Sequence, residues 1–135
     1  LVKKNPKLKL LLVGPIDKNE RTDFIERINS EELKKHILYY EWMDISNLPS
    51  LISASNLCLS PIEKNEQHES GIANKVYQYM VFGKALLVSN CKPQADLVTQ
   101  FNAGMVHQGD DAKDLAKKIE LMYSDKDELE NMISN

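Results

Sequence analysis

The residues best suited to chemistry lie on one predicted helix, residues 71–82, where Gly71, Lys75 and Gln78 recur at helical spacing. At about 100° per residue they share one stripe of the helix surface with Asn74. A glycine at a helix start lets an anion approach the exposed backbone N–H groups, whose dipoles attract negative charge. Lys75 adds a cation one turn later, and Gln78, about 10 Å from the start, can hydrogen-bond hydroxyl groups. The spacing predicts a site for a diphosphate with an attached ribose.

The same helix also has a structural interpretation that needs no ligand. A polar stripe on a helix is usually only a solvated face, and Gly71 is then only a turn residue. The neighbouring face is apolar and is expected to pack on a sheet; it consists of Ile72, Val76, Tyr79 and Met80. The residue pattern alone leaves both interpretations open.

Apolar runs and helical patterns alternate along the chain around this helix. The predicted strands cover residues 8–13, 37–42, 57–62, 85–89 and 103–107. The predicted helices cover residues 22–36, with a break at Asn29, and 48–54, 71–82, 93–101, 112–123 and 127–133. This alternation is typical of a doubly wound α/β layer. We therefore predict one domain over residues 1–135, a Rossmann-like three-layer α/β fold with a mostly parallel sheet of about five strands.

Composition and charge narrow the class of protein. The 135 residues are 42% hydrophobic and 27% charged, with a net charge of −3, which are values of an ordinary globular domain. A domain that binds nucleic acid through phosphates usually has a basic excess, so we expect no nucleic-acid partner. No apolar run approaches the roughly 20 residues of a membrane span. Cys58 and Cys91 lie in or beside apolar runs and are expected to be buried free thiols in the cytoplasm.

Several familiar catalytic motifs are missing from the sequence. After the first strand it reads Gly14-Pro15-Ile16 rather than a dinucleotide-binding glycine pattern. It has no phosphate-binding Gly-Lys-Ser/Thr loop and no Gly-x-Ser-x-Gly nucleophile elbow. The three histidines and two cysteines lack metal-ligand spacing. We therefore expect no metal and no cofactor.

The segment from Asn74 to Ser89, which reads NKVYQYMVFGKALLVS, resembles a helix and the following strand in the C-terminal domain of GT-B glycosyltransferases, in the retaining group called group 1 or family 4. The similarity extends over nearly the whole chain, through residues 10–14, 37–58, 103–106 and 110–122. It implies a donor-binding domain of a retaining glycosyltransferase. That enzyme would transfer a hexose-type sugar from a nucleoside diphosphate sugar, such as a UDP-sugar, to a hydroxyl acceptor in polysaccharide biosynthesis.

The resemblance also implies roles for individual residues. The backbone amides of Gly71 and Ile72, with Lys75, would hold the diphosphate; Lys75 would also stabilise it as the leaving group, and Gln78 would bind the ribose. The residues expected to frame the base are Trp42, Met43 and Ile45, and those expected to face the donor sugar are His68, Glu69 and Ser70. Two alternatives stay open: Trp42 as a core or domain-edge aromatic, and residues 68–70 as a solvated loop.

The sequence departs from the family pattern at two positions. Members often carry two glutamates separated by seven residues, and here Ser70 and Gln78 stand in their places. Gln78 keeps the hydrogen bonding but removes the charge, which puts an acid-base role in doubt.

The resemblance finally implies what accompanies this domain. We expect the first strand of the domain and an N-terminal acceptor-binding domain to precede residue 1, so that the 135 residues alone would be inactive. The parent protein would be cytoplasmic, with at most peripheral contact at the inner face of the membrane. Two other functions remain possible: half of a sugar-nucleotide epimerase, and a non-catalytic α/β interaction module.

Overall fold

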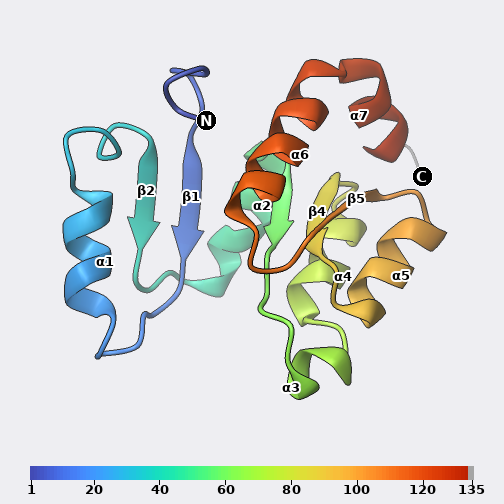
Figure 1. Ribbon diagram of the computed structural model, residues 1–135, viewed down its shortest axis with the longest axis horizontal. Helices are drawn as coiled ribbons and strands as arrows, with labels where there is room; N and C mark the ends of the chain where they lie inside the picture. Colours follow the sequence, from blue (N-terminus) through green and yellow to red (C-terminus); the bar gives the residue numbers. More distant parts are fainter. Residues whose placement is uncertain (134–135) are drawn as a thin grey trace. The chain divides into compact units, whose positions relative to one another are not determined.

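The computed structural model describes residues 1–133, without the side chains of residues 126–128 and 133. It divides into two compact units, Leu1–Leu48 and Pro49–Asn135, each of which is described here by itself (Figure 1). The elements in chain order are β1 (Leu10–Val13), α1 (Arg21–Ile28), β2 (Ile37–Tyr40), the short 3-10 helix η1 (Ile45–Asn47), α2 (Leu48–Ala54), β3 (Cys58–Ser60), α3 (Glu66–Glu69), α4 (Asn74–Val81), β4 (Leu86–Ser89), α5 (Lys92–Gln100), β5 (Gly104–His107), α6 (Ala112–Ser124) and α7 (Lys126–Ile133).

The first unit is a small parallel β-α-β arrangement. Strands β1 and β2 pair in parallel, with Leu10 opposite Ile37, and the rings of Phe24 on α1 and Tyr39 on β2 form a T-shaped pair with their centroids 5.4 Å apart. The helix predicted over residues 22–36 is shorter in the structure. It ends at Ile28, where Asn29 turns its side-chain amide back to a backbone carbonyl, and residues 31–36 form turns. None of residues 1–48, all of which are described, is buried. This unit therefore has no closed core of its own.

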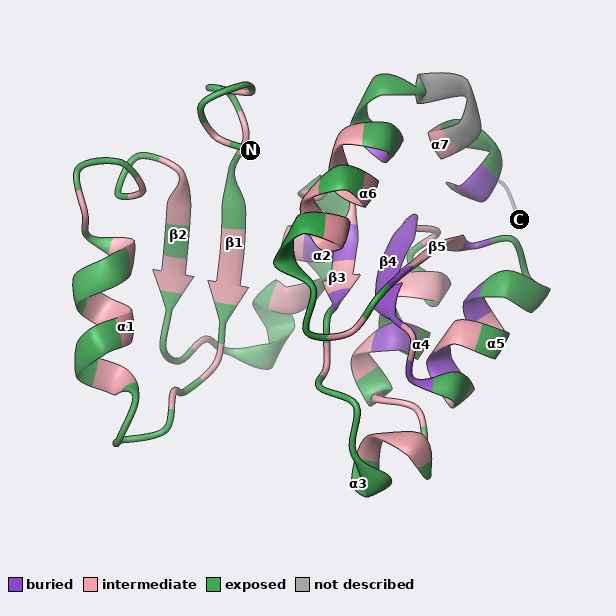
Figure 2. Ribbon diagram, viewed as in Figure 1, coloured by how far each residue is buried: buried purple, intermediate pink, exposed green. Residues whose placement is uncertain are grey.

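The second unit contains the core. Strands β3, β4 and β5 form a parallel sheet with β4 in the centre, and Figure 2 shows β4 as buried along its length. Because side chains alternate between the two faces of a strand, Leu86 and Val88 pack in a cluster with α4 and α5. Leu87 packs in a second cluster with α6 and α7. Helices on both faces of the sheet confirm the three-layer α/β prediction.

Parallel strands bring their carboxyl ends to one edge of the sheet. In this unit β3 ends at Ser60, β4 at Ser89 and β5 at His107. The loop after β3 leads into α3 and then α4, the loop after β4 leads into α5, and the loop after β5 leads into α6. This is the edge at which doubly wound proteins bind their ligands, and it carries the candidate site.

Two expectations about the fold need correction. The five strands form two parallel sheets, of two and three strands, rather than one sheet. Sequence alternation predicts how many strands there are, whereas hydrogen bonding decides which edges pair. The loop predicted over residues 63–70 contains the short helix α3, because the Asn65 side chain accepts the N–H of His68 and caps a turn. Among the described residues, no helix is both long and apolar enough to cross a lipid bilayer.

Candidate functional site

The two predicted faces of α4 are confirmed. Val76 is fully buried in the cluster with Leu86 and Val88. The other residues of the apolar face pack against the same cluster; they are Ile72, Tyr79 and Met80. On the polar stripe, Asn74 and Gln78 are exposed and Lys75 is partly buried. The apolar face thus fixes the rotation of the helix and leaves the polar stripe at its border.

The start of α4 differs from the prediction. The helix begins at Asn74 rather than Gly71, because Ala73 has an extended backbone with φ −63° and ψ 132°. Gly71 and Ile72 therefore lie in the approach to the helix and not in its first turn. Gln78 is four residues, about 6 Å along the axis, from the first helical residue, instead of the expected 10 Å. Beyond the two neighbouring residues of the chain, no protein atom lies within 4 Å of the position that a Cβ on Gly71 would occupy, so this approach is open.

The N-terminus of α4 differs from those of three neighbouring helices. The first N–H groups of α3, α5 and α6 each donate to a side-chain oxygen, and these oxygens belong to Asn65, Glu69 and Asp111 respectively. The N-cap of α4 is Ala73, whose side chain cannot accept a hydrogen bond. The first N–H groups of a helix have no partner within the helix. In the described part of the chain, α4 is thus the one of these four helices whose first N–H groups donate to no side-chain oxygen, although the N–H of Val76 donates to the Ala73 carbonyl at 2.9 Å.

Lys75 supplies the positive charge beside this helix end. Its side chain is partly buried, and the described residues include no hydrogen-bond or ion-pair partner for it. Desolvation by the surrounding protein lowers the pKa of the Lys75 ammonium below its ordinary value. A desolvated cation next to uncapped amides is an arrangement that favours an anion such as a phosphate.

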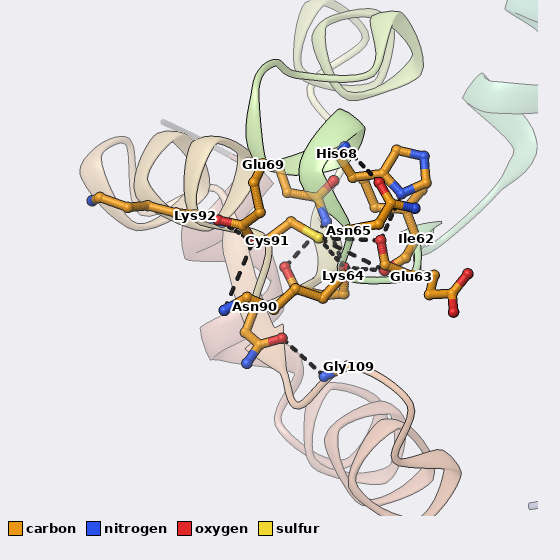
Figure 3. Close-up of polar contacts among 12 residues, drawn as sticks. Ile62, Glu63, Lys64, Asn65, His68, Glu69, Asn90, Cys91, Lys92 and Gly109 are labelled. Atoms are coloured by element: carbon orange, nitrogen blue, oxygen red, sulfur yellow. Dashed lines mark hydrogen bonds and ion pairs between the residues drawn. The ribbon is translucent and has the colours of Figure 1, made fainter.

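The three residues expected to face the donor sugar all make contacts within the protein. The ring Nδ1 of His68 donates to the carbonyl of Glu63 at 2.6 Å, and the Ser70 hydroxyl donates to the carbonyl of Gln67 at 2.7 Å. The Glu69 carboxylate accepts the backbone N–H of Lys92 at 3.3 Å. Figure 3 shows His68 and Glu69 among these contacts. Ser70 is exposed, whereas His68 and Glu69 are partly buried, so the solvated-loop interpretation and a role toward a sugar both stay predictions.

The residues expected to frame the base belong to the first unit. Trp42 is 80% exposed and Ile45 is 75% exposed, while Met43 is partly buried. Trp42 is therefore not a core aromatic in this structure, and the alternative in which it lies at a domain edge stays open. The contact of these three residues with a base stays a prediction.

Sequence reasoning missed a buried polar network at the ends of β3 and β4. Gln94 on α5 is fully buried; its carbonyl oxygen accepts from the Ser60 hydroxyl at 2.9 Å. Its amide nitrogen donates to the carbonyl and hydroxyl of Ser89 at 3.1 and 2.8 Å. A signal was present, since Gln94 lies three and four residues before Leu97 and Val98 on the apolar face of its helix.

The two cysteines are buried free thiols, as predicted. Burial raises the pKa of the Cys58 thiol to about 11. The sulfur of Cys91 lies 3.6 Å from the carbonyl oxygen of Glu63. Across the described residues, no group of three or more acidic, histidine or cysteine side chains is arranged to hold a metal ion.

Comparisons with known proteins identify the family and the fold of this chain. The family model described as glycosyl transferases group 1 matches residues 1–135, and comparison with curated proteins gives no match. Among solved structures, the C-terminal domain of a glycosyl transferase group 1 family protein (LpcC) from Francisella tularensis has a TM-score of 0.82 at 17% identity, and the match covers 99% of this chain and 68% of that one. The sucrose-phosphate synthase of Thermosynechococcus elongatus has a TM-score of 0.78 at 20% identity, over 96% of this chain and 33% of that one. HepE of Anabaena, solved in complex with UDP-glucose, has a TM-score of 0.80 at 17% identity, over 96% and 35%.

These comparisons differ in what they show. At such low identities the solved structures show the fold, and this chain spans about a third of the length of the sucrose-phosphate synthase and of HepE. The family model matches over the full length of the sequence. The resemblance to the C-terminal domain of GT-B glycosyltransferases is thereby confirmed, and the chain belongs to the group 1 glycosyltransferases.

Proposed function

We propose that this domain binds the nucleoside diphosphate of an activated sugar, at the N-terminus of α4. The observation that carries the proposal is the uncapped start of this helix next to the desolvated Lys75. Neighbouring helix ends at the same edge are filled by side chains of the protein itself. An incoming diphosphate would supply the negative charge that α4 lacks.

The proposed reaction is transfer of a hexose-type sugar to a hydroxyl acceptor with retention of configuration. When the bond between the sugar and the diphosphate breaks, negative charge develops on the diphosphate. Fixed amides and the Lys75 ammonium would stabilise that charge without reorganising, which lowers the barrier to departure. In this role Lys75 is both a binding and a catalytic residue, and the amides of Gly71 and Ile72 approach the same phosphates.

UDP is the nucleotide that we propose for the donor. HepE, which shares the fold, was solved in complex with UDP and with UDP-glucose. In the proposed arrangement Gln78 hydrogen-bonds the ribose. Because the chain spans only about a third of HepE, we further propose an N-terminal, acceptor-binding domain as its partner.

Calorimetric titration with UDP and with uridine tests the site. Replacement Lys75→Ala removes a cation from the diphosphate only, so UDP should bind about 10- to 100-fold more weakly while uridine binding stays unchanged. The control is Lys117→Ala, which removes an exposed lysine on α6 and should leave both affinities as they are. Equal losses for UDP and uridine, or no loss for either, would refute the assignment of Lys75 to the diphosphate.

A second titration tests the function itself. The unaltered chain is titrated with UDP and with GDP, since both carry the diphosphate but differ in the base. Binding of either supports a nucleotide-sugar domain, and the stronger ligand identifies the base. A chain that binds neither nucleotide would instead be an interaction module.

A further inference from the structure

The segment between β3 and α4, residues 61–73, is fastened to the edge of the sheet at several points. The carbonyl of Ile62 accepts the Ser89 hydroxyl at 2.6 Å. The Cys91 sulfur lies 3.6 Å from the carbonyl oxygen of the next residue, Glu63. Both contacts hold the beginning of the segment at the carboxyl end of β4. Its other end, residues 70–73, directly precedes the uncapped first turn of α4.

Glu69 fastens the second half of this segment. Its Oε1 atom accepts the N–H of Lys92, the first residue of α5, at 3.3 Å. The same oxygen lies 3.8 Å from the ammonium of Lys64. Figure 3 shows the Glu69 carboxylate directed at the beginning of α5, beside Cys91 and Lys92. A carboxylate at a helix N-terminus is stabilised by the helix dipole, so this contact places an anion favourably at the start of α5.

The position of Glu69 in the chain gives this contact a consequence. Glu69 is two residues before Gly71 and four before Ala73, the N-cap of α4. Beyond its two neighbours in the chain, no protein atom lies within 4 Å of the position of a Cβ on Gly71, and a glycine backbone has more conformational freedom than that of other residues. The Glu69 contact with Lys92 is therefore the last described side-chain anchor on α5 before the chain reaches the approach to α4.

We propose that Glu69 is a positioning residue for the diphosphate site and not a contact of the donor sugar. By holding the first turn of α5 it limits the conformations of residues 70 and 71, which lie between this contact and Ile72 and Ala73, packed against the core cluster. The amides of this segment and of the α4 start are then already arranged when the diphosphate arrives, which reduces the ordering cost of binding. This inference rests on the proposed function, because it concerns the same site.

The ligand UDP separates the two roles, since it has the diphosphate but no sugar. Glu69→Ala should raise the Kd for UDP about 3- to 10-fold, the range expected when a partly buried anion is lost from a helix end. Glu69→Gln keeps an oxygen acceptor for Lys92 and should restore most of the affinity. The control is Glu66→Ala, an exposed residue of the same short helix, which should bind UDP as the unaltered chain does.

The hydrogen-bond donor of this contact, the backbone N–H of Lys92, provides a second test. Lys92→Pro removes the N–H that Glu69 accepts, and proline is well tolerated in the first turn of a helix. Lys92→Ala keeps that N–H and removes only the side chain, which pairs with Asp96. The proline variant should weaken UDP binding as Glu69→Ala does, whereas the alanine variant should not.

Hydrogen exchange of the full chain without ligand tests the inference independently. Amides of residues 70–75 should exchange about 3- to 10-fold faster in Glu69→Ala and Lys92→Pro than in their controls. Unchanged exchange in both variants, or UDP affinity equal to that of the controls, would overturn the positioning role. If the unaltered chain does not bind UDP, the proposed function fails, and exchange at residues 70–75 still tests the anchor. If Glu69→Ala does not fold, the difference in exchange between Lys92→Pro and Lys92→Ala tests the same contact.

Discussion

Gln94 joins three elements at the edge of the sheet that carries the candidate site. It lies on α5 and has no exposed surface. Its side chain accepts from the Ser60 hydroxyl at the end of β3 and donates to the carbonyls of Ser60 and Ser89 at 3.2 and 3.1 Å. A 2.8 Å contact with the Ser89 hydroxyl completes the set. Removing the amide would therefore take a hydrogen-bond partner from several buried polar groups at once.

The change Gln94→Leu tests this with little change in side-chain volume. The Ser60 hydroxyl loses its acceptor, and two carbonyls lose a donor, whereas the Ser89 hydroxyl keeps the Ile62 carbonyl as acceptor. Each buried polar group that loses its hydrogen-bond partner lowers the free energy of unfolding by about 1–3 kcal/mol. Burial of the leucine side chain offsets about 1–2 kcal/mol of this loss. We expect the free energy of unfolding to fall by about 3 kcal/mol, which lowers Tm by about 10 °C.

Thermal and urea unfolding of matched variants measure this cost. Gln100→Leu makes the same change at an exposed position on the same helix and should alter the free energy of unfolding by less than about 0.5 kcal/mol. Ser60→Ala removes one hydroxyl and should cost about 1 kcal/mol. If Gln94→Leu and Gln100→Leu are equally stable, the network does not stabilise the sheet edge, and the reasoning is refuted.

Two further predictions concern Gly104 and Cys58. A Cβ on Gly104 would lie 1.9 Å from the backbone oxygen of Leu86. Gly104→Ala should therefore force β5 away from β4 and lower the free energy of unfolding, measured in urea, by about 3 kcal/mol. The control is Gly71→Ala, where a Cβ has open space, and equal stability of the two variants would contradict the close approach. Because burial raises the pKa of Cys58 to about 11, the folded chain keeps a proton that the unfolded chain loses above about pH 8.5. The stability that the Cys58 thiol contributes is therefore present below about pH 8.5 and is lost as the pH rises toward the pKa of the thiol in the folded chain. A thiol reagent at pH 8 should modify Cys58 at least about 100-fold more slowly in the folded than in the unfolded chain. Similar rates in both states would show that the thiol is not desolvated.

Local patterns predicted most elements and failed where they carried no signal. The helix α2 has the predicted bounds, Leu48–Ala54, since an apolar pattern and an early proline mark it. The predicted start of α4 is three residues too early because Ala73, its N-cap, is not one of the residue types that mark a helix beginning. For α3 the signal was present in Asn65, whose side chain caps the turn, but a polar loop with three glutamates hid it.

The sequence by itself determined the alternation of strands and helices, the apolar and polar faces of α4, and the family. These properties depend on residues one to four positions apart, which periodicity records directly. Only the tertiary structure decided which polar groups have partners: Glu69 meets Lys92 across 23 positions, and Gln94 meets Ser60 across 34. It also decided that Lys75 is desolvated. Contacts between distant segments depend on how the sheet brings the ends of its strands together, and a pattern over one to four residues carries no information about residues so far apart in the chain.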